Sequence, residues 1–258
     1  MNSAGIDIGS ISTKAAIMND GVLMGTKVIF TGYNAEMAGK KVLDTVLAEL
    51  NLPPESIDLV VATGYGRKSM ASADKIITEI SCHAAGARYL NPRVRSIIDI
   101  GGQDSKAILI DENGSVIDFV MNDKCAAGTG RFLEVMAGAL EVDLDKFGEI
   151  SLRAESPSKI SSLCTVFAES EVISLISKGE SRENIIAGIH ESICGRISAM
   201  THRIGIKPPV MMTGGVAKNI GVVRALERII GTPIEVSMYA QENGAIGAAF
   251  LAQNLAAV

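Results

Sequence analysis

A ten-residue pattern occurs twice in this chain, and it constrains the fold more than any other feature of the sequence. Residues 6–15 read IDIGSISTKA and residues 98–107 read IDIGGQDSKA, at a constant offset of 92 residues. Each copy is followed by a turn sequence, Asn19-Asp20-Gly21 or Asp111-Glu112-Asn113-Gly114, and then by another apolar run. Each copy therefore predicts strand, tight turn, strand, turn and strand.

A second repeated feature supports an internal duplication. Residues 58–64 (DLVVATG) and 209–214 (PVMMTG) are apolar runs that end in Thr-Gly, and both predict a buried strand that leads into a loop. The distance from Asp7 to Thr63 is 56 residues, whereas the distance from Asp99 to Thr213 is 114 residues. We therefore expect two homologous lobes, residues 1–95 plus 240–258 and residues 96–239, of which the second carries an insertion.

Helical patterns fill the intervals between the predicted strands, so the chain is expected to have an α/β fold. Asn34 is a suitable N-cap for a helix through Leu50, and Ser181 is suitable for a long helix that ends before Gly205. Further helices are expected over residues 78–90, 128–140, 165–178 and about 243–256.

Charge and hydropathy exclude several classes of partner. A net charge of -5 disfavours nucleic-acid binding, and no apolar run has the length needed to cross a bilayer. The N-terminal MNSAGIDIGS lacks the basic and apolar regions of a signal peptide. We therefore expect a cytoplasmic protein with neither nucleic-acid nor membrane partners. Its cysteines, at positions 82, 125, 164 and 194, are then thiols, metal ligands or redox groups.

An aspartate at a strand end, followed by glycine and hydroxyl residues, is typical of a phosphate-binding turn. The backbone N–H groups and hydroxyls contact phosphate oxygens, while the carboxylate holds Mg²⁺ directly or through water. One such hairpin alone is explained by its turn, but two with aspartate at the same place favour a nucleotide bound in a cleft between facing lobes. The chain contains neither G-x-x-x-x-G-K-[ST] nor G-x-G-x-x-G, which argues against P-loop and Rossmann designs.

The predicted nucleotide site draws on both repeats and on the second Thr-Gly sequence. Asp7 and Asp99 are expected to form the Mg²⁺ environment, and Gln103 or Asp104 is expected to position or polarise the attacking water. The residues expected to contact ATP or ADP are Asp7, Gly9, Ser10, Ser12, Thr13, Lys14, Asp99, Gly101, Gly102, Gln103, Thr213, Gly214, Gly215, Lys218 and Gln241.

The motifs DIGS, DIGGQD and TGG, in this order, resemble the phosphate and adenosine motifs of the actin/hexokinase/sugar-kinase superfamily. Over nearly the whole chain the sequence is more closely similar to BadF/BadG/BcrA/BcrD-type ATPases. These include the activators, or component A, of 2-hydroxyacyl-CoA dehydratases and the ATPase subunits of benzoyl-CoA reductase. The stretches that carry this resemblance are ATGYGR (62–67), EISCHA (79–84), IIDIGGQDSK (97–106), MNDKCAAGTGRFLEVMA (121–137), CTVFAESEVISL (164–175), IIAGIH (185–190) and MTGGVAKN (212–219). The resemblance implies two duplicated ribonuclease-H-like (actin-like ATPase) lobes.

Cys125 and Cys164 each precede a predicted helix, whose unpaired N–H groups favour a thiolate or an anionic cluster. An iron–sulfur cluster takes four cysteine ligands, and a two-fold homodimer would supply two from each chain. Chemistry alone leaves open whether both are ordinary small residues. The resemblance implies one [4Fe-4S] cluster shared across a homodimer by these two positions. Cys82 and Cys194 are expected to pack in the core, and the role of His83 stays open.

The resemblance implies an ATP-dependent reductase that couples hydrolysis to one-electron transfer. The acceptor would be an iron–sulfur protein, either a 2-hydroxyacyl-CoA dehydratase or a double-cubane cluster protein, and the donor a ferredoxin or flavodoxin. A small-molecule kinase of the same superfamily is the main alternative, and it needs a hydroxyl pocket and a general base but no paired thiolates. A third possibility is a non-enzymatic, actin-like assembly or sensor protein.

Overall fold

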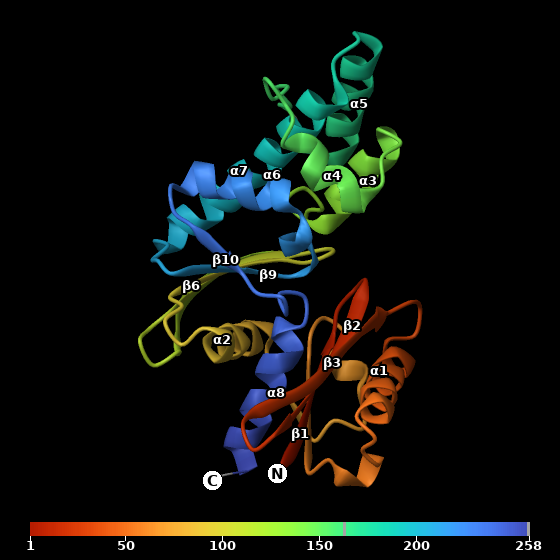
Figure 1. Cartoon of the computed structure of the whole chain (residues 1–258), viewed down its shortest axis with the longest axis vertical. Coiled ribbons are helices and arrows are strands. Elements are labelled where there is room, and N and C mark those ends of the chain that lie inside the picture. Colours follow the sequence, from red (N-terminus) through yellow and green to blue (C-terminus); the bar gives the residue numbers. More distant parts are fainter. Residues whose placement is uncertain (162–163, 257–258) are drawn as a thin grey trace. The chain divides into compact units, whose positions relative to one another are not determined.

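The computed structural model describes residues 1–161 and 164–256 (Figure 1). The chain divides into two compact units. Unit 1 comprises residues 1–97, 110–117 and the C-terminal residues from 237 onward, and unit 2 comprises residues 98–109 and 118–236. Two five-stranded sheets organise the fold; the first lies in unit 1 and most of the second lies in unit 2.

The first sheet has the order β3-β2-β1-β4-β5. Its central strand β1 pairs antiparallel with β2 and parallel with β4. Nearly all of β1 is buried, as expected for an apolar central strand that is covered on both faces. The strands are β1 (Asn2–Ile8), β2 (Ser12–Asn19), β3 (Val22–Phe30), β4 (Leu59–Thr63) and β5 (Lys75–Ile76).

The second sheet has the order β10-β9-β6-β7-β8, which, taken from the opposite edge, matches the first sheet strand for strand. The two IDIG sequences form the ends of the equivalent strands β1 and β6, and the two Thr-Gly sequences follow β4 and β9. The predicted duplication is therefore confirmed. The strands are β6 (Ser96–Ile100), β7 (Ser105–Ile110), β8 (Val116–Asn122), β9 (Val210–Thr213) and β10 (Ile234–Val236).

The predicted helix boundaries are confirmed by their caps. The Asn34 side chain accepts a hydrogen bond from the Met37 N–H at 3.0 Å, and the Ser181 hydroxyl accepts one from the Asn184 N–H at 3.2 Å. Gly205 ends the long helix with φ of +70°, a conformation that glycine adopts without a steric penalty. The helices expected from the sequence are α1 (Ala35–Glu49), α2 (Glu79–Leu90), α3 (Gly130–Ala139), α5 (Thr165–Ser177), α6 (Arg182–Ile204) and α8 (Asn243–Ala256).

Two further helices complete unit 2. The sequence did not predict α4 (Leu144–Ser151), and the helix that follows the second Thr-Gly sequence does not begin directly after it. A 3₁₀ turn over Gly215–Lys218 intervenes before α7 (Ile220–Ile230). Two more 3₁₀ turns, Pro54–Ser56 and Arg67–Ser69, lie in unit 1. The insertion expected in the second repeat forms α3, α4 and α5, which lie next to one another beyond α6 and α7 (Figure 1).

The last helix, α8, packs closely on β1 and on α2 because glycines stand at the contacts. A Cβ on Gly5 of β1 would lie 2.0 Å from the Ala245 carbonyl oxygen. A Cβ on Gly247 would lie 1.8 Å from the Cys82 carbonyl oxygen of α2. The neighbouring alanines on α8, including Ala248 and Ala252, are fully buried. The small-residue sequence of this helix therefore allows backbone to pack against backbone.

We predict that Gly247→Ala destabilises the protein by about 1–3 kcal/mol, because the new methyl group overlaps the backbone of α2. The matched control is Gly195→Ala, also within a helix, where a Cβ meets nothing within 4 Å. The control substitution should leave the stability unchanged or raise it by up to about 1 kcal/mol, because alanine has a higher helix propensity than glycine. Urea unfolding followed by circular dichroism measures both changes. Equal stabilities for the two variants would contradict this packing.

Candidate functional site

The turn between β1 and β2 places an acid and a lysine side by side. Asp7 is 5% exposed at the end of β1, and its cross-strand partner in the register is Lys14. The Lys14 Nζ lies 3.3 Å from Asp7 Oδ2. A Cβ on Gly9 would lie 2.7 Å from the Ser12 carbonyl oxygen and 3.1 Å from Lys14 Nζ. A glycine is thus required for the turn to close over the lysine.

The corresponding turn between β6 and β7 holds a denser cluster of charges. Asp99, at the end of β6, accepts a hydrogen bond at Oδ2 from Lys106 Nζ at 3.1 Å and at Oδ1 from the Thr213 hydroxyl at 2.8 Å. Lys106 Nζ also contacts Asp104 Oδ2 at 2.6 Å. Lys106 is only 2% exposed. Lys106 was not among the residues predicted for the site, although the repeat aligns it with Lys14, because lysine is rarely buried.

The loop after β9 joins this cluster. Gly214 has φ of +86°, and a Cβ there would lie 2.3 Å from the Ile100 carbonyl oxygen. Glycine is therefore needed both for the backbone conformation and for the close approach to β6. In unit 2 the structure brings together Asp99, Thr213 and Gly214, as expected of one site. Gly215 and Lys218 lie on the 3₁₀ turn that follows.

Some of the other predicted residues contact the turn between β1 and β2, whereas others make contacts inside the protein. Gln241 Nε2 lies 3.4 Å from the Ser12 hydroxyl, so these two predicted residues are brought together. The Thr13 hydroxyl is fully buried and bonds to Thr31 Oγ1 at 2.9 Å, which directs it into the protein. In the second turn Gln103 is exposed, whereas Asp104 is partly buried beside Lys106.

His83, in the EISCHA sequence, lies near Asp7 at the end of β1. The sequence alone gave no place for this residue in the site. A Cβ on Gly244, in the first turn of α8, would lie 3.0 Å from Asp7 Oδ2 and 3.1 Å from His83 Nε2. The Asn243 side chain donates a hydrogen bond to the His83 carbonyl oxygen at 3.0 Å. The imidazole and the Asp7 carboxylate therefore both lie against the start of α8.

The two cysteines predicted as ligands differ from the other two in accessibility. Cys164 is exposed at the N-cap position of α5, and Cys125 is half-buried in the loop before α3. Cys82 and Cys194 are fully buried, as predicted, and burial raises the pKa of each thiol to about 12. Within residues 1–161 and 164–256, no three His, Cys, Asp or Glu side chains are grouped closely enough to bind a metal ion. One chain by itself thus offers at most two accessible thiols.

The start of α3 is attached to the second turn by its backbone. The Gly130 N–H donates to the Gly101 carbonyl oxygen at 2.8 Å, and the Arg131 N–H donates to the Gly102 carbonyl oxygen at 2.8 Å. These N–H groups belong to the helix N-terminus and have no partner within the helix. The turn that carries the acids and the helix that follows Cys125 are therefore one connected structure.

His190, in the IIAGIH sequence, joins α4, α6 and the cap of α7. Its Nδ1 lies 3.0 Å from the Ser151 hydroxyl and its Nε2 lies 3.2 Å from Asn219 Nδ2. Because the Ser151 hydroxyl donates to the Gly148 carbonyl oxygen and the amide nitrogen is a donor, the network assigns the proton to Nδ1. Asn219 caps α7 by accepting from the Val222 N–H at 3.1 Å. Burial lowers the pKa of His190 to about 3.

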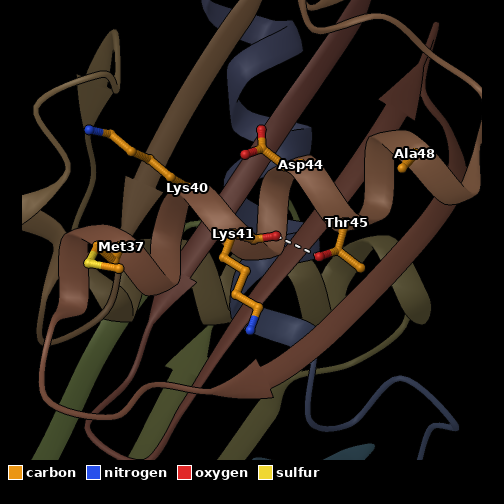
Figure 2. Close-up of a pocket in the computed structure, with 6 residues that line it drawn as sticks. All are labelled: Met37, Lys40, Lys41, Asp44, Thr45 and Ala48. Atoms are coloured by element: carbon orange, nitrogen blue, oxygen red, sulfur yellow. Dashed lines mark hydrogen bonds between the residues drawn. The ribbon is translucent and has the colours of Figure 1, made fainter.

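A shallow surface depression of about 580 Å³ lies along α1 (Figure 2). It contains none of the predicted site residues, and Lys40 and Lys41 extend from it in different directions (Figure 2). The residues that line it are Met37, Lys40, Lys41, Asp44, Thr45 and Ala48. Among the described helices, none combines the length and the hydropathy needed to span a bilayer.

The two equivalent sheets, with an aspartate near the end of each central strand and a glycine turn after it, define a duplicated α/β fold of the actin and sugar-kinase class. A hexokinase of the ROK type from Thermus thermophilus has this fold, with a TM-score of 0.57 and 12% identity over 100% of this chain and 99% of that one. At that identity the likeness concerns the fold alone.

The chain belongs to the BadF/BadG/BcrA/BcrD ATPase family, whose sequence model matches residues 4–252. It is 50% identical over 257 residues to the activator of lactoyl-CoA dehydratase from Anaerotignum propionicum, covering 99% of both chains. It is 47% identical over 254 residues to the (R)-2-hydroxyglutaryl-CoA dehydratase activating ATPase from Acidaminococcus fermentans, covering 98% of this chain and 97% of that one. The solved activator of the 2-hydroxyisocaproyl-CoA dehydratase from Clostridium difficile, with bound ADPNP, matches with a TM-score of 0.94 and 47% identity, covering 100% of this chain and 96% of that one.

We predict that iodoacetamide alkylates Cys125 and Cys164 at least roughly tenfold faster than Cys82 and Cys194 in the folded, cluster-free protein, since the thiolate is the reacting form. A raised pKa keeps both buried thiols protonated at neutral pH. Peptide mass spectrometry under exclusion of oxygen measures the four rates, and unfolding in urea should make them similar. Equal alkylation rates for the four cysteines in the folded protein would contradict the assignment of Cys125 and Cys164 as the accessible thiols.

We predict that the free energy of unfolding falls as the pH is lowered from about 6.5 towards 3, because the unfolded chain then takes up a proton that the folded chain excludes from His190. The contribution of this group is complete above pH 6.5 and is lost as the pH approaches its folded pKa of about 3. In His190→Gln the slope should be smaller by up to about 1.4 kcal/mol per pH unit. His202→Gln, at an exposed position on the same helix, should retain the wild-type slope. If the free energy of unfolding has the same pH dependence in all three proteins, His190 does not contribute to it and the prediction is wrong.

Proposed function

We propose that the protein is an ATP-dependent activator of the kind that serves 2-hydroxyacyl-CoA dehydratases. It would act as a homodimer that couples ATP hydrolysis to the transfer of one electron to a low-potential iron–sulfur protein. Membership of the ATPase family and relatives named as dehydratase activators support this proposal. The acceptor would be a 2-hydroxyacyl-CoA dehydratase or a double-cubane cluster protein, and the donor a ferredoxin or flavodoxin.

Nucleotide binding is proposed for the turns of both repeats. Gly9, Ser10 and Ser12 from the first repeat and Gly101 and Gly102 from the second would contact phosphate oxygens through N–H groups and hydroxyls. The loop after β9, with Lys218, and Gln241 would contact the nucleoside. A solved relative at 47% identity holds bound ADPNP, which supports nucleotide binding by this chain. The hydroxyl of Thr13 is buried and bonds to Thr31, so we assign Thr13 to stabilising the pairing of β2 with β3.

The acids at the two strand ends suit a bound Mg²⁺. Mg²⁺ prefers oxygen ligands and keeps several of its waters. The two carboxylate oxygens of Asp99 already accept hydrogen bonds, one from Thr213 and one from Lys106. The Asp7 carboxylate is likewise engaged, by Lys14. Asp7 and Asp99 would therefore hold the ion through its waters. When bound, Mg²⁺ would neutralise charge on the phosphates.

Gln103 is the residue we assign to the attacking water. Its side chain is exposed at the tip of the second turn, in the part of the molecule proposed to face the phosphates. Asp104, in contrast, is directed back to Lys106 at 2.6 Å. A neutral amide can both donate to and accept from a water, which is how glutamine orients water in other nucleotide hydrolases. Asp104 then contributes charge to the site while Gln103 contributes orientation.

Cys125 and Cys164 fit a [4Fe-4S] cluster that is shared by two chains. Both thiols are accessible, and they precede α3 and α5, which lie side by side (Figure 1). The exposed side of α5 beside Cys164 is apolar, with Val166 and Phe167 both about two-thirds exposed. Such a face is unfavourable in water and favourable in an interface between copies. When bound, the cluster would supply the electron that is transferred.

The observation that best supports coupling is the pair of hydrogen bonds from Gly130 and Arg131 to Gly101 and Gly102. A phosphate-dependent movement of the second turn would move the start of α3, and with it the loop that carries Cys125. ATP drives such a change only if the two arrangements bind nucleotide with different affinity. The coupling therefore needs no separate transmitting element between the turn and the helix.

We predict that Cys125→Ser, reconstituted with iron and sulfide without oxygen, holds no iron and runs as a monomer, because half of the ligands are lost. Wild type should hold four iron atoms per two chains. Nucleotide binding should be kept, because Cys125 lies outside the proposed phosphate turns. Iron analysis, gel filtration and calorimetry with MgADP measure these properties. Cys82→Ala, at a buried thiol, is the control and should retain its iron. A full iron content in Cys125→Ser would count against the proposed cluster.

A further inference from the structure

We propose that Lys106 is a positioning residue with a specific role in metal binding. It acts as a built-in cation that Asp99 and Asp104 share, and it thereby limits how tightly the site binds a divalent metal ion. The proposal rests on the proposed function, because it assigns a regulatory charge to the same site. Neither the repeat pattern nor the predicted nucleotide contacts gave this residue a role.

The contacts of Lys106 are those of a fully enclosed ammonium group. Its Nζ lies 3.1 Å from Asp99 Oδ2 and 2.6 Å from Asp104 Oδ2. The lysine side chain is 2% exposed and that of Asp99 is 3% exposed, whereas that of Asp104 is 24% exposed. Lys106 therefore joins a deeply buried acid to one that reaches the surface of the turn.

The first repeat provides an internal comparison. Asp7 and Lys14 correspond to Asp99 and Lys106, but the position of Asp104 is occupied by Ser12. Lys14 Nζ lies 3.3 Å from its acid, and the side chain is 13% exposed. The second copy thus has an additional carboxylate, and its lysine is more completely enclosed.

The backbone of the second turn directs Asp104 inward. The Gly101 N–H donates to the Asp104 carbonyl oxygen at 2.9 Å, which closes the turn. A Cβ on Gly101 would lie 2.6 Å from Asp104 Oδ1, so the carboxylate occupies space that any other residue would fill. The turn therefore holds Asp104 where it meets the ammonium.

The charges of these three groups have a consequence for metal binding. Two carboxylates and one ammonium leave one net negative charge, which attracts a divalent ion less strongly than two would. Without the ammonium, the two neighbouring carboxylates repel each other, and a divalent cation beside them relieves that repulsion. Oxygen ligands of this kind suit Mg²⁺ and Mn²⁺. Lys106 would thus prevent a metal ion from binding tightly before the nucleotide brings one.

A lysine that serves only to stabilise the fold predicts something different. Removing one partner of a buried ion pair is destabilising. If Lys106 serves the fold alone and no ion approaches the two acids, the Mn²⁺ affinity of Lys106→Met stays at the wild-type value. Metal affinity without nucleotide therefore separates the two roles, and it can be measured without any assay of activity.

The experiment measures Mn²⁺ binding in the absence of nucleotide, by the electron paramagnetic resonance signal of free Mn²⁺. Lys106→Met should bind Mn²⁺ at least roughly tenfold more tightly than wild type, since one repelling positive charge is removed. Lys106→Met/Asp104→Asn should lose that gain. Lys40→Met is the control, because Lys40 pairs with Glu36 on the exposed face of α1, and it should behave as wild type.

Folded Lys106→Met with wild-type Mn²⁺ affinity would overturn the proposal, as would a gain that survives in the double variant. If Lys106→Met does not fold, Asp104→Asn replaces it: the remaining pair has no net charge, so Mn²⁺ binding in the presence of ADP should weaken roughly tenfold. Unchanged binding there would also overturn it. The proposed function is tested separately, because Mn²⁺ binding is measured without nucleotide. A wild-type protein that binds no MgADP would refute the proposed function but not the role of Lys106.

Discussion

Buried ion pairs at the ends of the two central strands are the interaction on which the rest of the structure depends. Asp99 meets Lys106 at 3.1 Å inside unit 2, and Asp7 meets Lys14 at 3.3 Å inside unit 1. Breaking a buried pair of this kind costs about 3–5 kcal/mol, because it leaves an uncompensated charge. The surrounding glycines are explained by this requirement: Gly9 and Gly101 leave the space in which a lysine or an acid folds back over its turn.

The insertion in the second repeat extends from this same region. The α3 backbone is bonded to the DIGG turn, and Cys125 lies in the loop just before that helix. Cys164 begins α5, which packs against α3. The first repeat has the same strand order and a similar acid–lysine pair but lacks the insertion that carries these two thiols. The insertion thus joins the loop that carries Cys125, through α3, to the turn of the second repeat.

Much of the fold could be predicted because it depends on local patterns. The repeat indicated two equivalent sets of strands, and Asn34, Ser181 and Gly205 marked helix ends through capping chemistry that acts within a few residues. The helix α4 was missed because eight residues provide too little periodicity. Lys106 was missed because its burial depends on two acids that converge only in the folded chain. The proximity of His83 to Asp7 depends likewise on α8, which is distant in sequence.

The most direct test of the proposed nucleotide site is the Mg²⁺ dependence of ADP binding, measured by calorimetry on wild type and on Asp99→Asn. We expect wild type to bind one ADP per chain and to bind it more tightly with Mg²⁺, because the carboxylate holds the waters of the ion. Asp99→Asn should bind ADP with nearly the same affinity whether Mg²⁺ is present or absent. Equal enhancement by Mg²⁺ in the two proteins would show that the metal lies elsewhere and that the strand-end acids serve the fold alone.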